Sequence, residues 1–190
     1  MKPLIIFLLM VLTSPLFAQD KSLPYYEIPG YPETFTAGAV ASRLIDGLGF
    51  RFYWATEGLR SADLSYRPND EARTSLETIE HIYGLSKMIL YSTKQKEKIS
   101  EPNAKLSFAG MRKAVLQNLK AASEKLLVSS DQDLKDFKIM LNGQEYPFWN
   151  QLNGPIADCL WHVGQVVSFR RSSGNPFSGK VEVFTGTVEK

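Results

Sequence analysis

Each of the only two histidines in this 190-residue chain follows a carboxylate at helical spacing. Asp158 lies four residues before His162, so on a helix the two side chains share one face. Neutral imidazole and carboxylate both bind divalent transition metals, and such a pair presents them from one rigid element. The spacing therefore indicates a metal site or, alternatively, a histidine that is hydrogen-bonded inside an ordinary helix.

The other histidine, His81, falls in the middle of a second helical pattern, SLETIEHIYGLS. Its face continues through Thr78, Leu85 and Met88, so the imidazole should point largely inward. A buried imidazole needs a polar partner, and two inward histidines can share one ion. We therefore expect His81 to meet the other histidine and its aspartate in a common site.

Two glutamates are further candidates for this site. Glu77 lies four residues before His81, but Thr74 and Glu77 have the spacing of a helix capping box, which gives Glu77 a structural role. Glu57 shares an aromatic-rich face of an earlier helix, where burial of a carboxylate is costly unless it is paired or ligating. Glu57 is therefore either a fourth ligand or general base, or a charge at a helix end that reaches water.

Four helices must position these residues. Their apolar residues recur at three- and four-residue spacing, and they cover approximately residues 36–59, 74–93, 107–128 and 155–173. In the last of them Pro155 suits the first turn and Gly174 the C-terminal cap, while Arg170 and Arg171 complement the helix dipole. Four amphipathic helices with longer connections predict an all-α protein with a four-helix bundle.

The connecting segments carry their own signals. Residues 20–34 hold three prolines and three tyrosines, which predicts a short extended N-terminal arm whose rings pack on the body of the protein. The charged stretch KQKEKISEPNAK predicts a solvated connection. Asn142-Gly143 between apolar flanks predicts a hairpin, and the alternating tail KVEVFTGTV predicts a short β-like element.

The N-terminus has the pattern of an export signal. One lysine, the apolar run Leu4 to Leu12, Pro15 and the small residue Ala18 follow the order of a secretory signal peptide over residues 1–18. The run is too short to span a bilayer comfortably, so we expect no transmembrane anchor after cleavage. The remaining residues 19–190 should form one domain that is exported, either to the periplasm or as a secreted protein.

Composition limits the classes of partner and of chemistry. The chain is 44% hydrophobic and 22% charged, as in an ordinary globular protein. A formal net charge of +2 is too small to suggest nucleic acid as a partner. Cys159 is the only cysteine, so no internal disulfide is possible, and a buried, inert thiol is expected.

Three stretches together resemble the DinB-like (DinB/YfiT) superfamily of metal-dependent proteins: YWATEGLRSADLSYRP, ETIEHIYGLS and GPIADCLWHVGQVVSFRRSSGNP. The resemblance covers roughly residues 35–176 and implies a four-helix bundle with a long crossover between its second and third helices. That superfamily takes one histidine from the second helix and two from an H-x-x-x-H pattern on a later one, often followed by Gly-Gln. His81 matches the first and His162 the last, Gly164-Gln165 follows, and Asp158 replaces the middle histidine.

The resemblance implies a divalent ion, such as zinc, nickel, manganese or iron, held by His81, Asp158 and His162 with Gln165 as an orienting neighbour. It also implies a metal-dependent hydrolase or thiol transferase for an unknown small-molecule substrate, and export favours hydrolysis over the use of cytosolic thiols. The alternative is a non-catalytic binding or structural module of the cell envelope whose site has lost the metal. A homodimer is compatible with a bundle.

Overall fold

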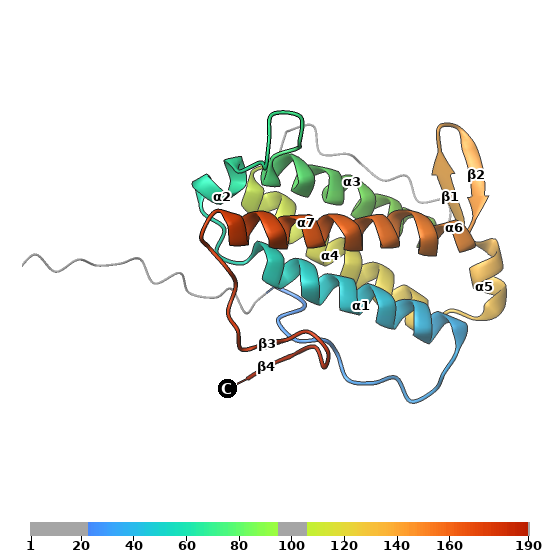
Figure 1. The fold of residues 1–190 in the computed structure, drawn as a ribbon. Coiled ribbons are helices and arrows are strands. Elements are labelled where there is room, and N and C mark those ends of the chain that lie inside the picture. Colours follow the sequence, from blue (N-terminus) through green and yellow to red (C-terminus); the bar gives the residue numbers. More distant parts are fainter. Residues whose placement is uncertain (1–22, 95–105, 190) are drawn as a thin grey trace, which may run out of the picture.

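The computed structural model describes residues 23–94 and 106–189, which form a mostly helical protein with two small antiparallel hairpins (Figure 1). The helices are α1 (Ala37–Thr56), α2 (Ser61–Ser65), α3 (Ser75–Thr93), α4 (Phe108–Leu127), α5 (Asp131–Asp136), α6 (Trp149–Gln151) and α7 (Ala157–Ser172). A π-helical turn, η1 (Leu152–Ile156), precedes α7, and the strands are β1 (Lys138–Leu141), β2 (Gln144–Pro147), β3 (Val181–Glu182) and β4 (Thr187–Val188). The expected signal peptide and nearly all of the charged connection after α3 lie outside the described residues.

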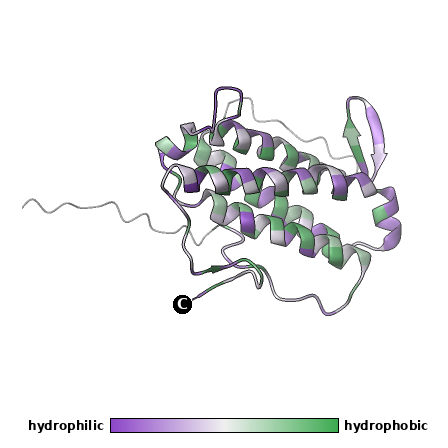
Figure 2. Ribbon diagram, viewed as in Figure 1, coloured by the Kyte–Doolittle hydropathy of each residue, from purple (hydrophilic) through white to green (hydrophobic). Residues whose placement is uncertain are grey.

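The four long helices lie side by side, and α1 and α3 each pack against both α4 and α7 (Figure 1). Their apolar faces turn toward one another and their polar faces outward (Figure 2). Residues with no exposed surface come from all four helices, among them Ile45, Phe52, Ile79, Ile82, Leu116, Leu119, Cys159 and Val166. The predicted helical class is therefore confirmed, since burial of these faces is the main stabilising contribution to such a fold.

Local capping residues fix the ends of the long helices. The Thr74 side chain accepts a hydrogen bond from the backbone of Glu77, and the Glu77 carboxylate accepts one from the backbone of Thr74, so the predicted capping box is confirmed. Ser107 caps α4 in the same position. Beyond α7, Gly174 has a φ of +76°, a left-handed conformation that favours glycine and ends a helix.

Two arginines from neighbouring helices satisfy the carboxyl end of α1. Arg170 of α7 is buried and donates hydrogen bonds to the carbonyls of Trp54 and Ala55. Arg112 of α4 donates to the Thr56 hydroxyl and forms an ion pair with Glu57. Because the last carbonyls of a helix have no partner within it, these contacts tie the end of α1 to both of its neighbours.

The short helix α2 was not predicted, and it is held by a buried carboxylate. Asp63 has no exposed surface and accepts hydrogen bonds from both the backbone and the guanidinium of Arg60. It also accepts from the hydroxyl of Ser173 and the amide of Asn175, just beyond α7. These donors, with the Arg60 side chain first, hold the pKa of Asp63 below its ordinary value.

We expect the contacts of Asp63 to make the protein less stable as the pH falls into the acid range. Because the pKa is lower in the folded state, Asp63 stabilises the fold fully above its unfolded pKa of about 3.9, and this contribution is lost as the pH falls below that value. The free energy of unfolding, from urea denaturation at pH 6 to 3, should fall more steeply for the native protein than for Asp63→Asn. The difference in slope is at most about 1.4 kcal/mol per pH unit. Parallel curves would contradict this account.

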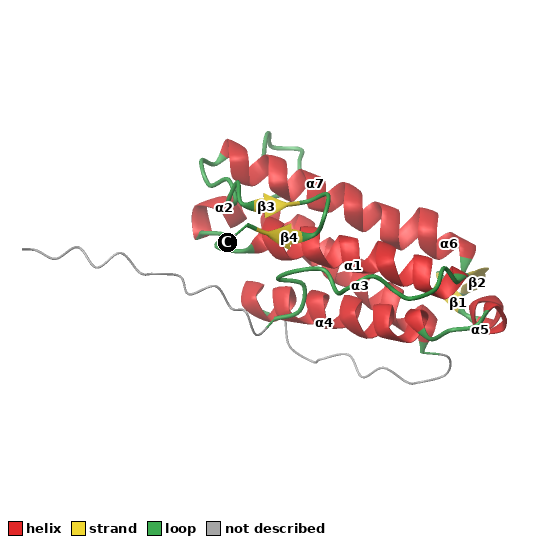
Figure 3. Cartoon of the chain, turned by 90° about the horizontal axis from the view of Figure 1, so that it is seen from below, coloured by secondary structure: helices red, strands yellow, loops and turns green. Residues whose placement is uncertain are grey.

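The rings of the N-terminal arm pack on α1, as predicted, but the arm begins with a turn in which Tyr25 has a φ of +73°. Figure 3 shows it beside the β3–β4 hairpin, where the Ile28 amide donates to the Gly186 carbonyl. The buried Tyr25 hydroxyl donates to Asp46 of α1, and its ring lies so close to Gly49 that a side chain at position 49 would collide with it. The arm is therefore an integral part of the folded domain.

Both predicted β elements are present. Asn142 and Gly143 both have positive φ, 52° and 78°, which is the geometry of a type I′ turn between β1 and β2. The tail forms the two short strands β3 and β4. The start of the last helix differs from the prediction, because Gly154 leaves the helical region (φ −98°, ψ −108°) and α7 begins at Ala157 rather than at Pro155.

Candidate metal centre

The candidate centre lies where α3 packs on α7. His81 comes from the second turn of α3, whereas Asp158 and His162 occupy successive turns on one face of α7. The chain is kinked at Gly154, directly before this segment. Two rigid helices thus supply all three side chains, which limits how far the ligand atoms can move apart.

The two imidazoles converge on one carboxylate. His81 Nε2 lies 3.2 Å from Asp158 Oδ2, and His162 Nε2 lies 3.3 Å from Asp158 Oδ1. The two imidazole rings are nearly perpendicular, with centroids 4.6 Å apart. One ligand atom from each residue lies within 4.8 Å of the others, so the group could hold a metal ion. Two imidazoles and one carboxylate form the facial set that suits iron(II), and each of the three ligands is also found in zinc sites.

The centre is open on one side. The side chains of His81 and Asp158 remain about one third exposed, at 34% and 38%, whereas His162 is largely covered at 13%. An ion held by three protein ligands keeps positions for water or substrate. The exposed side of the group is where these positions would be reached from solvent.

Gln165 lies one turn beyond His162, and its Oε1 is 2.8 Å from His162 Nδ1. The amide oxygen accepts a hydrogen bond, so Nδ1 is the donor of this contact and Nε2 is left to bind a proton or a cation. Nε2 faces Asp158 Oδ1, which is an acceptor. A histidine that binds a metal through one ring nitrogen commonly donates its other N–H to such an acceptor, so the contact with Gln165 suits a metal ligand.

The contact of Gln165 leads to a specific prediction. Gln165→Leu removes the acceptor that fixes the tautomer and orientation of His162, while all three ligands remain. Loss of such an outer hydrogen bond typically weakens metal binding by about 10- to 100-fold. Calorimetric titration of the metal-free protein with zinc should show this loss. Gln165→Glu keeps an acceptor and should retain most of the affinity, and equal affinity in the Leu variant would refute the assigned role.

Glu57 does not join this group. It is the C-terminal cap of α1, and its carboxylate is occupied by the ion pair with Arg112. Arg112 also lies over the ring of Tyr53, 4.5 Å from its centroid. The expectation that Glu57 is a fourth ligand or a general base therefore finds no support in its contacts, and neither does the alternative of a free charge in water. Sequence spacing could not reveal the arginine, which lies 55 residues further along the chain.

The two remaining candidates have structural surroundings. Glu77 remains in its capping box with Thr74 and is not part of the group of ligand atoms. Cys159 is fully buried in the core, and burial, followed by the charge of Asp158, raises the pKa of its thiol. A thiol held neutral in this way is a poor nucleophile and a poor ligand. Both sequence interpretations agree with these contacts.

The fold and the site together define a mostly helical protein with a histidine–carboxylate cluster that could hold a metal ion. Comparison of the chain with family models, curated proteins and solved structures yields no match. Within residues 23–94 and 106–189, every helix falls short of the length and apolar character needed to cross a bilayer.

Proposed function

We propose that this protein binds one divalent metal ion through Nε2 of His81, Nε2 of His162 and the carboxylate of Asp158. The observation that carries the proposal is the convergence of both imidazoles on different oxygens of one carboxylate, from two packed helices. The donor set fits zinc, nickel, manganese and iron(II), because neutral imidazole nitrogen and carboxylate oxygen bind all four.

We further propose that the protein is a DinB-like four-helix bundle whose site acts as a metal-dependent hydrolase, or as a thiol transferase, on a small molecule. The stretches around His81 and His162 and the packing of four long helices support this assignment. A divalent ion bound here would supply Lewis acidity, which lowers the pKa of a coordinated water or thiol. The chain holds the ligands, orients His162 through Gln165 and leaves the side of His81 and Asp158 open to substrate.

Assays of the metal-loaded protein test the proposed activity. Protein loaded with each of the four ions is offered ester, amide and phosphodiester substrates, and electrophiles together with low-molecular-weight thiols. We expect turnover with at least one substrate class, lost by at least about 100-fold in Asp158→Asn. Turnover that persists in this variant would place the chemistry elsewhere. A metal-bound protein that is inactive toward the whole panel would contradict the assignment as an enzyme.

A second function is a non-catalytic module of the cell envelope whose site has lost the metal, and the same two distances are compatible with a site of this kind. Separations of 3.2 Å and 3.3 Å also permit direct imidazole–carboxylate hydrogen bonds without an ion. In that case Asp158→Asn would change stability to the same extent with and without added metal. A metal-dependent difference between the native protein and this variant would exclude the module.

A further inference from the structure

A groove of about 830 Å³ follows α1 on the side where the N-terminal arm and the β3–β4 hairpin lie. Apolar and aromatic side chains form most of its wall, among them Ile28, Tyr31, Phe35, Val40, Leu44 and Phe184. A second hollow of about 620 Å³ shares Val40 and Leu44 with it and continues toward α5 and α6. We call the wall of the first groove, with its rim, the α1 apolar face.

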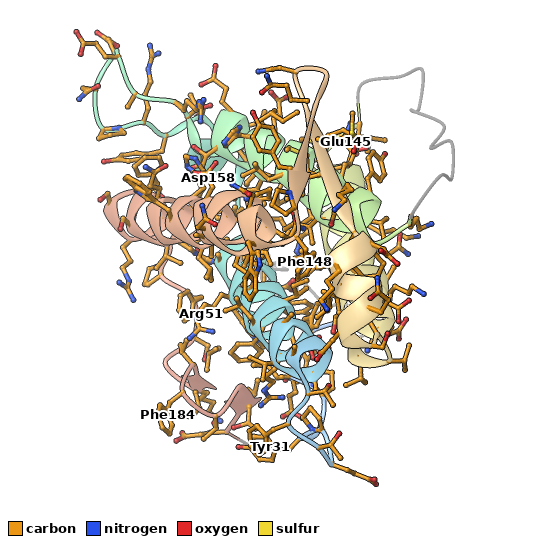
Figure 4. All side chains as sticks on the ribbon, turned by 90° about the vertical axis from the view of Figure 1, so that its right-hand side faces the viewer. Tyr31, Arg51, Glu145, Phe148, Asp158 and Phe184 are labelled. Carbon is orange, nitrogen blue, oxygen red and sulfur yellow. The ribbon has the colours of Figure 1, made fainter. Side chains whose placement is uncertain are left out.

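The rim of the α1 apolar face carries aromatic rings with almost no cover. Phe184, in the β3–β4 turn, is 100% exposed, and Phe35 and Tyr31, in the arm, are 98% and 82% exposed. Figure 4 shows Tyr31 and Phe184 projecting on the same side of the molecule. Soluble proteins rarely gather large apolar side chains in one exposed patch unless the patch binds something.

The lining of the groove itself has a one-sided charge. It includes Arg43 and Arg51 and no acidic residue. Arg43 donates to the Pro29 carbonyl and lies over the Tyr31 ring, and Arg51 donates to the Gly47 carbonyl. Within the described part of the chain, neither guanidinium has a carboxylate partner. Each arginine has five N–H donors, so most of them remain available for an anion.

We propose that the α1 apolar face docks on the surface of a lipid bilayer that contains anionic lipids. Aromatic rings partition into the interfacial layer of a membrane, and arginines at the same level interact with phosphate groups. Fully exposed rings that project from loops can insert into such a layer. A folded protein partner would instead need a surface whose shape is complementary to these rings. The charge of the face selects anionic over zwitterionic lipid.

Docking of this kind leaves the candidate metal centre accessible. Leu160 of α7 lines the groove, whereas Asp158 and His162 lie on another face of the same helix. Figure 4 shows Asp158 on the far side of α7 from Phe184 and Tyr31. The site would therefore face the aqueous phase while the protein rests on the membrane. This proposal does not depend on whether a metal is bound.

Vesicle sedimentation tests the proposal. The protein used is the chain expected after cleavage of the signal peptide, residues 19–190. Vesicles of phosphatidylcholine alone and vesicles with one third phosphatidylglycerol are compared. We expect binding to the anionic vesicles that weakens as salt is added. Phe35→Ser with Phe184→Ser should reduce this binding by about ten-fold or more, and Arg43→Gln with Arg51→Gln should abolish the preference for anionic lipid.

Trp161→Ser is the matched control, because Trp161 is a 72% exposed aromatic residue on α7 that does not line the groove. It should leave binding unchanged. Circular dichroism should show that every variant is folded, because the three aromatic side chains are exposed and the two arginines are only partly buried. Failure of the native protein to bind anionic vesicles, or an equal loss in the Trp161 variant, would overturn the proposal. Self-association through this face, detected by analytical ultracentrifugation and abolished by Phe35→Ser with Phe184→Ser, would also overturn the proposal.

Discussion

Addition of zinc or another suitable divalent ion should raise the thermal stability of the native protein and leave that of His81→Ala unchanged. A ligand that binds only the folded state stabilises it by about 2.7 kcal/mol at 100 times its dissociation constant. For a chain of this size that corresponds to a rise in melting temperature of roughly 5–10 °C. Removal of one of three ligands should abolish the rise, since the two remaining ligands both come from α7.

The matched control for this experiment is Glu77→Gln. Glu77 lies on α3, one turn before His81, and it caps the helix instead of joining the group of ligand atoms. This substitution should lower stability by no more than about 1 kcal/mol, because the glutamine amide oxygen can still complete the capping box and only the negative charge at the helix N-terminus is lost. The additional stability that metal confers should remain intact. Equal loss of the metal-dependent rise in both variants would show that α3 had been perturbed as a whole.

The largest effect on folding is expected from Gly38→Ala near the start of α1. A Cβ at this position would collide with the backbone carbonyl oxygen of Leu126 and would lie 2.7 Å from that of Ser129. Backbone atoms cannot move aside as a flexible side chain can, so α1 would have to separate from the end of α4. We expect a loss of about 3 kcal/mol in the free energy of unfolding, measured by urea denaturation.

Gly164→Ala on α7 provides the comparison for this substitution. Apart from its own helix backbone, no described atom lies within 4 Å of a Cβ at position 164, so alanine meets no obstacle there. Alanine is favoured over glycine inside a helix, and this variant should gain about 0.5–1 kcal/mol. If Gly38→Ala were as stable as Gly164→Ala, the close approach of α1 to the end of α4 would be wrong.

Features determined by neighbouring residues could be predicted from the sequence. The cap at Thr74, the turn at Asn142-Gly143 and the helix end at Gly174 each depend on a few consecutive residues. The shared face of Asp158 and His162, with Gln165 beside it, follows from the helical repeat alone. The meeting of this face with His81 was an expectation from the scarcity of histidine, and the packing of α3 on α7 agrees with it.

Other contacts between distant parts of the chain were not predictable. Arg170 was interpreted as a charge that complements a helix dipole, yet it is buried and donates to carbonyls 115 and 116 residues earlier. The partners of Asp63 beyond α7, and the arginine that pairs with Glu57, are similarly remote. A helical pattern shows which face of a helix is apolar, but it does not specify the neighbour that will face each polar residue on that helix.

Metal content of the untagged native protein tests the central claim most directly. The protein is purified without added metal and without a histidine tag, and its elements are measured beside those of His81→Ala and Asp158→Asn. The proposed centre predicts close to one equivalent of a divalent metal in the native protein and its loss from both variants. A native protein that holds no metal, even after zinc, manganese, nickel and iron(II) have been offered, would contradict the claim.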